Sequence, residues 1–112
     1  MKLIRAIIKP ERLHAVKDKL NEVGIKGMTV SEVKGFGHQK GKTEFYRGNP
    51  VQVHFLPKIQ IFLAVTDDKK DDVVNAIMDA ARTGKYGDGK FFINNLEEVV
   101  RIRTGEKGEE AL

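Results

Sequence analysis

The chain has 112 residues, of which 40% are hydrophobic and 32% charged, as expected for one globular domain without a second core. It has no cysteine, and its histidines are scattered at His14, His38 and His54. These features exclude disulfides and thiolate chemistry and argue against a structural metal site. No apolar run approaches the ~20 residues that span a bilayer and no signal-peptide core is present, so we expect a cytoplasmic protein without membrane insertion. The formal charge of +4 favours an anionic partner.

The first half of the chain predicts a strand over 2–8, a helix beginning at Pro10 and a strand over 28–36. Pro10 suits the first turn of a helix because it has no N–H to donate. The apolar positions of this helix recur at steps of three and four, and Gly24 supplies the left-handed residue that ends it. These positions are Leu13, Val16, Leu20 and Val23.

The second half begins with an aperiodic interval, about 37–57, which predicts a long mobile loop, because unstructured segments of about twenty residues are usually functional or disordered. A strand over 59–65 follows, and then a helix capped by Asp67 or Asp68 that ends near Gly84. Short strands are predicted over 91–93 and 99–103, and a polar tail from 105. The second helix's apolar stripe is Val73, Val74, Ile77, Met78 and Ala81.

The order strand, helix, strand, strand, helix, strand predicts an α+β, ferredoxin-like (split βαβ) fold for a single domain over 1–112, with two helices on one face of an antiparallel sheet. Both faces of the strand over 59–65 are apolar, because Phe62 and Ala64 point away from the Ile59 side. We therefore expect an oligomer packed through the open sheet face. The alternative is that loops cover the strand ends.

A glycine-rich stretch over 83–90 links the second helix to the next strand. Gly84, Gly87 and Gly89 let backbone N–H groups converge on one point, which favours phosphate binding, and Lys85 and Lys90 add positive charge. The stretch is not a P-loop, since that motif opens a helix. A plain turn is the simpler alternative.

Arg101 and Arg103 stand two positions apart on a predicted strand, which would place both guanidinium groups on one face, roughly 7 Å apart. That spacing suits neighbouring phosphates, although solvated charges on an edge strand are the alternative. Between Lys34 and Lys58 five cations accompany a single carboxylate. Within this loop the adjacent aromatic and arginine side chains predict an interaction tip: Phe45, Tyr46 and Arg47.

Several segments together resemble the PII nitrogen-regulatory proteins over essentially the whole chain. They are Ala6-Ile7-Ile8-Lys9-Pro10, residues 27–37, Tyr46-Arg47-Gly48, Leu56-Pro57-Lys58, residues 83–85 and 87–90, and Arg101-Ile102-Arg103-Thr104-Gly105. The resemblance implies a ferredoxin-like homotrimer that binds ATP or ADP in clefts between subunits and is not an enzyme. It also implies 2-oxoglutarate bound through Mg²⁺, and a protruding loop that docks on targets such as an ammonium transporter, which would hold the protein at the membrane, or glutamine synthetase.

The same resemblance assigns site residues. The nucleotide positions are Thr29, Gly37, His38, Ala64, Gly87, Asp88, Gly89, Lys90, Arg101, Ile102 and Arg103. The 2-oxoglutarate positions are Gln39, Lys40, Gly41, Leu56 and Lys58. Gln39 would ligate Mg²⁺ together with ATP phosphates, since magnesium takes oxygen ligands.

The chain departs from the family pattern at four positions. Val51 has no hydroxyl, which rules out uridylylation at the usual position, and Asn49 replaces a serine that some relatives phosphorylate. Phe62 stands where many relatives have an acidic residue and His38 where many have arginine. These two positions leave the preference between ATP and ADP open.

Two other classes of protein compete with this interpretation. Lys34-Gly35-Phe36-Gly37 matches the opening of an RNA-binding RNP1 pattern, but the stacking aromatics that should follow are absent. A small phosphoryl-transfer or acyl-phosphate enzyme could use His38, yet no carboxylate stands at a recognisable spacing to orient it. His14 belongs on the surface of the first helix.

Overall fold

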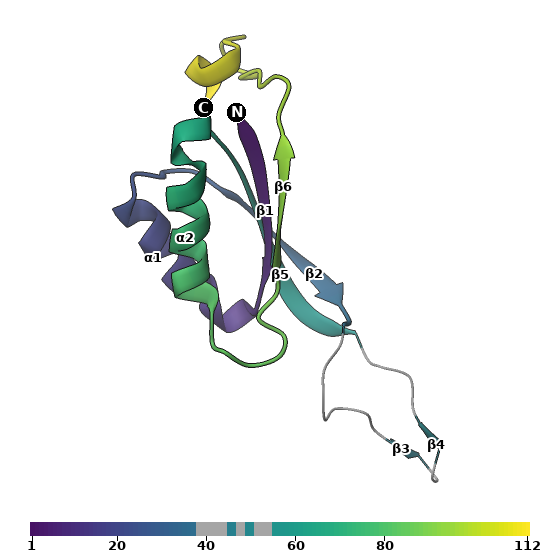
Figure 1. Cartoon of the computed structure of the whole chain (residues 1–112). Helices are drawn as coiled ribbons and strands as arrows, with labels where there is room; N and C mark the ends of the chain where they lie inside the picture. The colour runs from purple at the N-terminus through teal and green to yellow at the C-terminus, as the bar shows by residue number, and fades with distance from the viewer. Residues whose placement is uncertain (38–44, 47–48, 51–54) are drawn as a thin grey trace.

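A four-stranded antiparallel sheet in the order β2-β5-β1-β6 carries α1 and α2 on one face (Figure 1). The computed structural model describes residues 1–37, 45–46, 49–50 and 55–112. The predicted ferredoxin-like α+β fold is confirmed. The elements are β1 (Lys2–Ile8), a 3-10 turn (Pro10–Arg12), α1 (Leu13–Glu22), β2 (Thr29–Gly35), β3 (Phe45–Tyr46), β4 (Asn49–Pro50), β5 (Leu56–Val65), a 3-10 turn (Asp67–Lys69), α2 (Lys70–Ala81), β6 (Lys90–Asn95) and a 3-10 turn (Gly108–Ala111).

The core lies between the sheet and the two helices. Alternate residues of β1 and β5 point toward the helices, and the predicted apolar faces of α1 and α2 meet them, because strand and helix periods place these positions on one side. The largest of the fully buried side chains are Ile4, Ile8, Val16, Leu20, Ile61, Val73 and Ile77. None of the helices in the described ranges is long and apolar enough to cross a membrane.

The predicted cap of α2 is wrong. The chain enters α2 through a 3-10 turn, in which the Lys69 and Lys70 N–H groups donate to the carbonyls of Thr66 and Asp67. No side chain caps this turn or the helix that follows. The Asp67 carboxylate instead lies 3.0 Å from the N-terminal amine. The left-handed residue predicted at Gly24 is confirmed, with φ of 87°.

The strand predicted over 99–103 is also wrong. β6 is the last named strand of the described chain, and beyond it Val100 forms only an isolated bridge with Lys107. The Arg101 N–H donates to the Glu106 carbonyl at 2.8 Å, and the Gly105 N–H donates to the Arg101 carbonyl at 2.8 Å. This segment therefore closes a local turn, because its own backbone groups supply partners that a neighbouring strand would otherwise provide.

The face of the sheet away from the helices carries several apolar side chains. The register pairs Leu3 with Ala64, and sets Arg5 between Phe62 and Phe92. All of these residues are at least partly exposed, with Phe92 half exposed. The predicted apolar character of both sheet faces is thus present in the structure.

Most of the loop predicted over 37–57 lies outside the described residues. Within it the structure gives the backbone pairing of β3 with β4, which form a separate two-stranded sheet, and β5 begins at Leu56, before the predicted end of the loop. At its base, Phe36 and Phe55 meet edge to face, with ring centroids 5.1 Å apart. Arg47, Val51 and the predicted 2-oxoglutarate residues Gln39, Lys40 and Gly41 also lie outside the described residues.

Arg12 ties the entry of α1 to the end of α2. Its Nε donates to the Ala80 carbonyl at 2.8 Å, and its Nη2 donates to the same oxygen. Arg12→Met keeps the apolar stem but removes both bonds, so we expect the free energy of unfolding to fall by about 1.5–3 kcal/mol. Urea unfolding measures this loss. Arg82→Met, which removes an exposed arginine just past α2, is the control and should change stability by less than about 0.5 kcal/mol.

Candidate functional site

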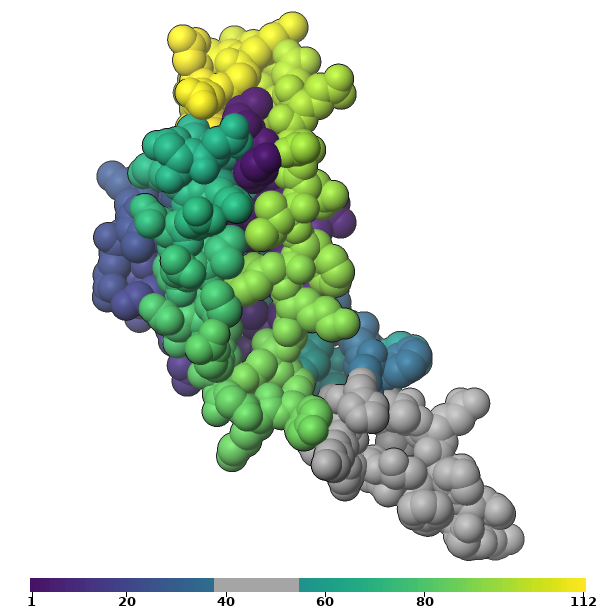
Figure 2. Space-filling view, viewed as in Figure 1, coloured from purple at the N-terminus to yellow at the C-terminus, as the bar shows by residue number. Residues whose placement is uncertain are grey.

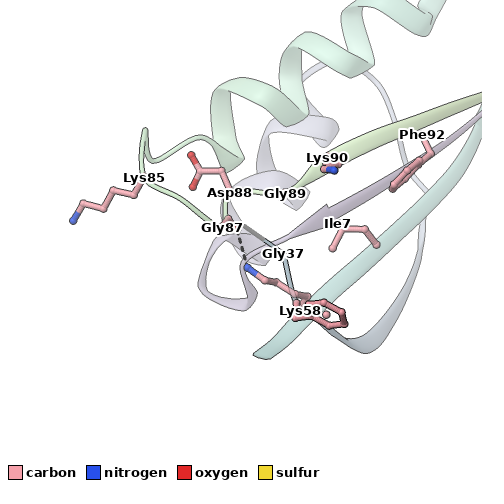
Figure 3. A pocket seen from close by; sticks show the side chains of 11 residues that line it. Ile7, Gly37, Lys58, Lys85, Gly87, Asp88, Gly89, Lys90 and Phe92 are labelled. Atoms are coloured by element: carbon pink, nitrogen blue, oxygen red, sulfur yellow. Dashed lines mark hydrogen bonds between the residues drawn. The ribbon is translucent and has the colours of Figure 1, made fainter. Parts of the chain in front are cut away.

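One pocket of about 500 Å³ lies where β1 and β2 end and β6 begins. It is lined by Ile7, Gly35, Phe36, Gly37, Lys58, Lys85, Gly87, Asp88, Gly89, Lys90 and Phe92 (Figure 3). The fold thus brings the predicted glycine-rich loop together with Gly37, the last residue described before the long loop, and with Lys58, predicted to bind 2-oxoglutarate. Such a concave, partly apolar site with a few charged groups is typical of small-molecule binding.

The glycine-rich loop depends on backbone angles that other residues rarely adopt. Gly84, Gly87 and Gly89 have φ of 83°, 94° and 98°. At Gly89 a Cβ would lie 1.6 Å from the Ile7 carbonyl oxygen, so the loop lies directly on the β1 backbone. Only glycine permits this approach. The loop is therefore held at a fixed distance from the sheet, with Gly87 and Gly89 lining the pocket.

The Asp88 carboxylate turns back into the loop. It accepts hydrogen bonds from the N–H groups of Thr83 and Gly84, each at 2.8 Å, and from the Thr83 hydroxyl. Desolvation raises the pKa of Asp88, but these bonds and the Lys9 ammonium together hold the pKa well below its ordinary value. A depressed pKa means that this carboxylate supports the fold above about pH 4 and loses that effect as the pH falls further.

Among the described residues of the lining, three lysines carry positive charge. The Lys58 ammonium, reaching from β5, donates to the Gly87 carbonyl at 2.7 Å (Figure 3). Lys90 is exposed at the start of β6, and Lys85 extends away from the other labelled side chains (Figure 3). Since Asp88 is the one acidic side chain among the described residues of the lining, this part of the pocket is electrostatically suited to an anion.

Arg101, Ile102 and Arg103 do not meet this pocket within one chain. They follow the far end of β6, a six-residue strand that spans about 20 Å. Figure 2 shows the C-terminal residues, in yellow, at the opposite end of the molecule from the glycine-rich loop. Thr29, Ala64 and Leu56 are placed on strands but do not line the pocket, and His38 lies outside the described residues.

The predicted pairing of the two arginines on a strand face is wrong, because this segment is a turn. The Arg101 guanidinium donates to the Glu106 carboxylate at 3.1 Å and to the Glu110 carbonyl at 3.2 Å. Ile102 between them is fully exposed. This segment of the chain therefore exposes the Arg103 cation and the apolar side chain of Ile102.

Sequence reasoning missed the apolar residues of the lining, Ile7, Phe36 and Phe92. Strand alternation places Ile7 and Phe92 on the open face, but nothing local shows that the pocket opens there. It also missed the contacts that Asp88 makes with Lys9, which is distant in the sequence, and with Thr83, which begins the same loop.

The fold and the pocket define a ferredoxin-like protein with a pocket lined by glycines and lysines at one end of its sheet. A family model described as "Nitrogen regulatory protein P-II" matches residues 1–106. The chain is 55% identical to a nitrogen regulatory protein P-II of Pasteurella multocida (strain Pm70), and 57% to one of Azospirillum brasilense. It is 54% identical to the nitrogen regulatory protein GlnK of Escherichia coli (strain K12). Each comparison covers 112 residues and the full length of both chains.

This chain therefore belongs to the P-II family of nitrogen regulatory proteins.

Proposed function

We propose that this protein senses adenine nucleotides, with ATP or ADP bound in the pocket and its phosphates on the glycine-rich loop and Lys90. The observation that carries the proposal is the loop itself, which Gly89 seats on the β1 backbone beside three lysines. Backbone N–H groups and ammonium groups are the partners that phosphate oxygens take. The volume of about 500 Å³ is in the range of small-molecule sites.

We propose further that a neighbouring copy completes the site, as in a homotrimer. Arg101, Ile102 and Arg103 lie far from the pocket of their own chain, and the sheet has an apolar open face that a second copy can bury. In such an assembly the arginines of one chain bind the phosphates held by the glycine-rich loop of the next.

The second proposed ligand is 2-oxoglutarate, held with Mg²⁺ in the presence of ATP. Lys58 is placed at the pocket, where its ammonium can pair with a carboxylate. Mg²⁺ would be held by nucleotide phosphates and by Gln39, an oxygen donor set suited to this hard cation. Gln39 lies outside the described residues.

The output we propose is regulation of nitrogen assimilation by docking, without enzymatic activity. Relatives are named nitrogen regulatory proteins, and the loop tip at Phe45, Tyr46 and Arg47 carries the residue types of a binding hot spot. Its targets would be an ammonium transporter or glutamine synthetase. The RNA-binding alternative is supported less well, since Phe36 lies beyond the end of β2 and its ring meets that of Phe55 edge to face.

Calorimetric titration with ATP and ADP tests the nucleotide site. We expect Lys90→Ala and Arg103→Ala each to weaken ATP binding by about 1.5–3 kcal/mol, the value of one charge-assisted hydrogen bond. Lys17→Met, which removes an exposed cation from α1, should leave binding unchanged. Unaltered affinity in both site variants would refute the assignment, and sequence-selective binding of RNA oligonucleotides would favour the alternative class.

A further inference from the structure

An acidic residue in a phosphate-binding loop needs an explanation, because its charge repels the ligand. In this chain the Asp88 carboxylate is half-buried and accepts hydrogen bonds from Thr83 and Gly84, the first residues of the loop that Asp88 closes. Its charge is thereby directed away from Gly87 and Gly89, its immediate neighbours in the loop (Figure 3).

Lys9 completes this arrangement from the sheet. It directly follows β1, and its ammonium lies 3.2 Å from Asp88 Oδ1 and 3.1 Å from Thr83 Oγ1. The Lys9 side chain is 17% exposed and the Asp88 side chain 24%, so solvent screens this pair less than a pair on the open surface. Lys9 thus neutralises Asp88 and fastens the loop to the end of the central strand.

The Thr83 hydroxyl is fully engaged at the same point. It donates to Asp88 and accepts from the Lys9 ammonium and from the Lys85 N–H at 3.2 Å. A hydroxyl has one donor and two acceptor lone pairs, so all of its hydrogen-bonding capacity serves the loop. The Lys9 ammonium directs two of its three donors to Thr83 and Asp88, so the triad of Lys9, Thr83 and Asp88 is bonded mainly within the loop.

We propose that Lys9, Thr83 and the Asp88 side chain are positioning residues of the phosphate site, which hold the glycine-rich loop in its anion-binding shape without contacting the ligand. The proposal rests on the proposed nucleotide function. Residues 87–90 bind the phosphates, and the triad sets where their N–H groups point. Because the three side chains act as one unit, removal of any member has the effect of removing all of them.

The test is a double-mutant cycle read out by ADP titration. We expect Lys9→Met and Asp88→Asn each to weaken ADP binding about 10-fold, and the double variant to weaken it about 10-fold as well, because the members are coupled. Independent contributions would multiply to about 100-fold. Lys9→Arg, which can still bridge both oxygens, should restore binding nearly to the wild-type value, and Lys17→Met controls for the lost charge.

Adenosine has no phosphates, so its affinity should not change in a variant that only misplaces the phosphate-binding loop. General damage to the fold would weaken adenosine binding as well. The affinity for adenosine, followed by NMR titration, should stay within about twofold in every variant. Thr83→Val serves as an independent variant if Asp88→Asn does not fold, and should also weaken ADP binding about 10-fold. Wild-type protein that binds no ADP would refute the proposed function. Wild-type protein that binds ADP, with variants that bind it equally well or that lose adenosine in parallel, would refute the positioning role alone.

Discussion

Gly89→Ala is expected to weaken ADP binding on the order of 100-fold, equivalent to roughly 3 kcal/mol. The added Cβ would lie 1.6 Å from the Ile7 carbonyl oxygen and 2.7 Å from its carbonyl carbon. Both atoms belong to β1, which pairs on both sides with β5 and β6 and cannot move away. The loop must leave the sheet instead, and Gly87 and Gly89, which line the pocket, would be displaced with it. Calorimetric titration with ADP measures the loss.

Alanine substitutions at two other glycines distinguish the effect of steric overlap from the effect of backbone strain. Gly84 and Gly105 also have positive φ, of 83° and 75°, but a Cβ at either would meet nothing within 4 Å. Each alanine variant should therefore be destabilised only by the strain of the left-handed region, which lowers stability by about 1–2 kcal/mol. Gly84→Ala should weaken ADP binding far less than Gly89→Ala does. Equal losses in the two variants would show that contact with β1 does not decide the shape of the loop.

The sheet and the helices are predictable because burial follows short-range periods. Ile59, Ile61 and Leu63 alternate with less buried residues, and Val16 and Leu20 recur one helical turn apart, so local sequence identifies both elements. The mistaken strand at 99–103 has an equally physical cause. Its β-branched residues favour a strand. The Arg101 N–H, however, donates to the Glu106 carbonyl, and the Arg101 carbonyl accepts from the Gly105 N–H, and these two bonds close a turn that strand propensity does not predict.

In the candidate site too, the local sequence predicts some features, whereas contacts between residues far apart in the sequence are not predicted. Glycines at 84, 87 and 89 predict a loop able to bind an anion, and the structure places that loop at a pocket. Lys9 and Thr83 are 74 positions apart in the sequence, and no local pattern links them. Residues such as Arg101 cannot be assigned to the pocket from one chain at all, because the proposed site spans two copies.

The second large expected effect is that ATP and 2-oxoglutarate strengthen each other's binding, and Lys58 is the described residue on which this coupling depends. Its ammonium already bonds the Gly87 carbonyl of the glycine-rich loop, so a 2-oxoglutarate carboxylate that binds Lys58 also acts on the loop that holds the phosphates. We expect ATP with Mg²⁺ to tighten 2-oxoglutarate binding about 5 to 150-fold, and linkage requires 2-oxoglutarate to tighten ATP binding by the same factor. ADP offers no γ-phosphate for the shared metal and should produce no such coupling.

Lys58→Met and Gln39→Ala test this coupling from its two sides. Each should abolish the effect of ATP on 2-oxoglutarate affinity, because one removes the partner of the carboxylate and the other an oxygen ligand of Mg²⁺. ADP binding in Gln39→Ala should stay near the wild-type value, since the glycine-rich loop and the arginines suffice for it. Lys34→Met is the matched control, because Lys34 adjoins Val33, the register partner of Lys58, and therefore points to the other face of the sheet.

Since Val51 cannot be uridylylated, ligand state should be the main control of the loop. Equal 2-oxoglutarate affinity with ATP, with ADP and without nucleotide would show that no such switch operates in this protein.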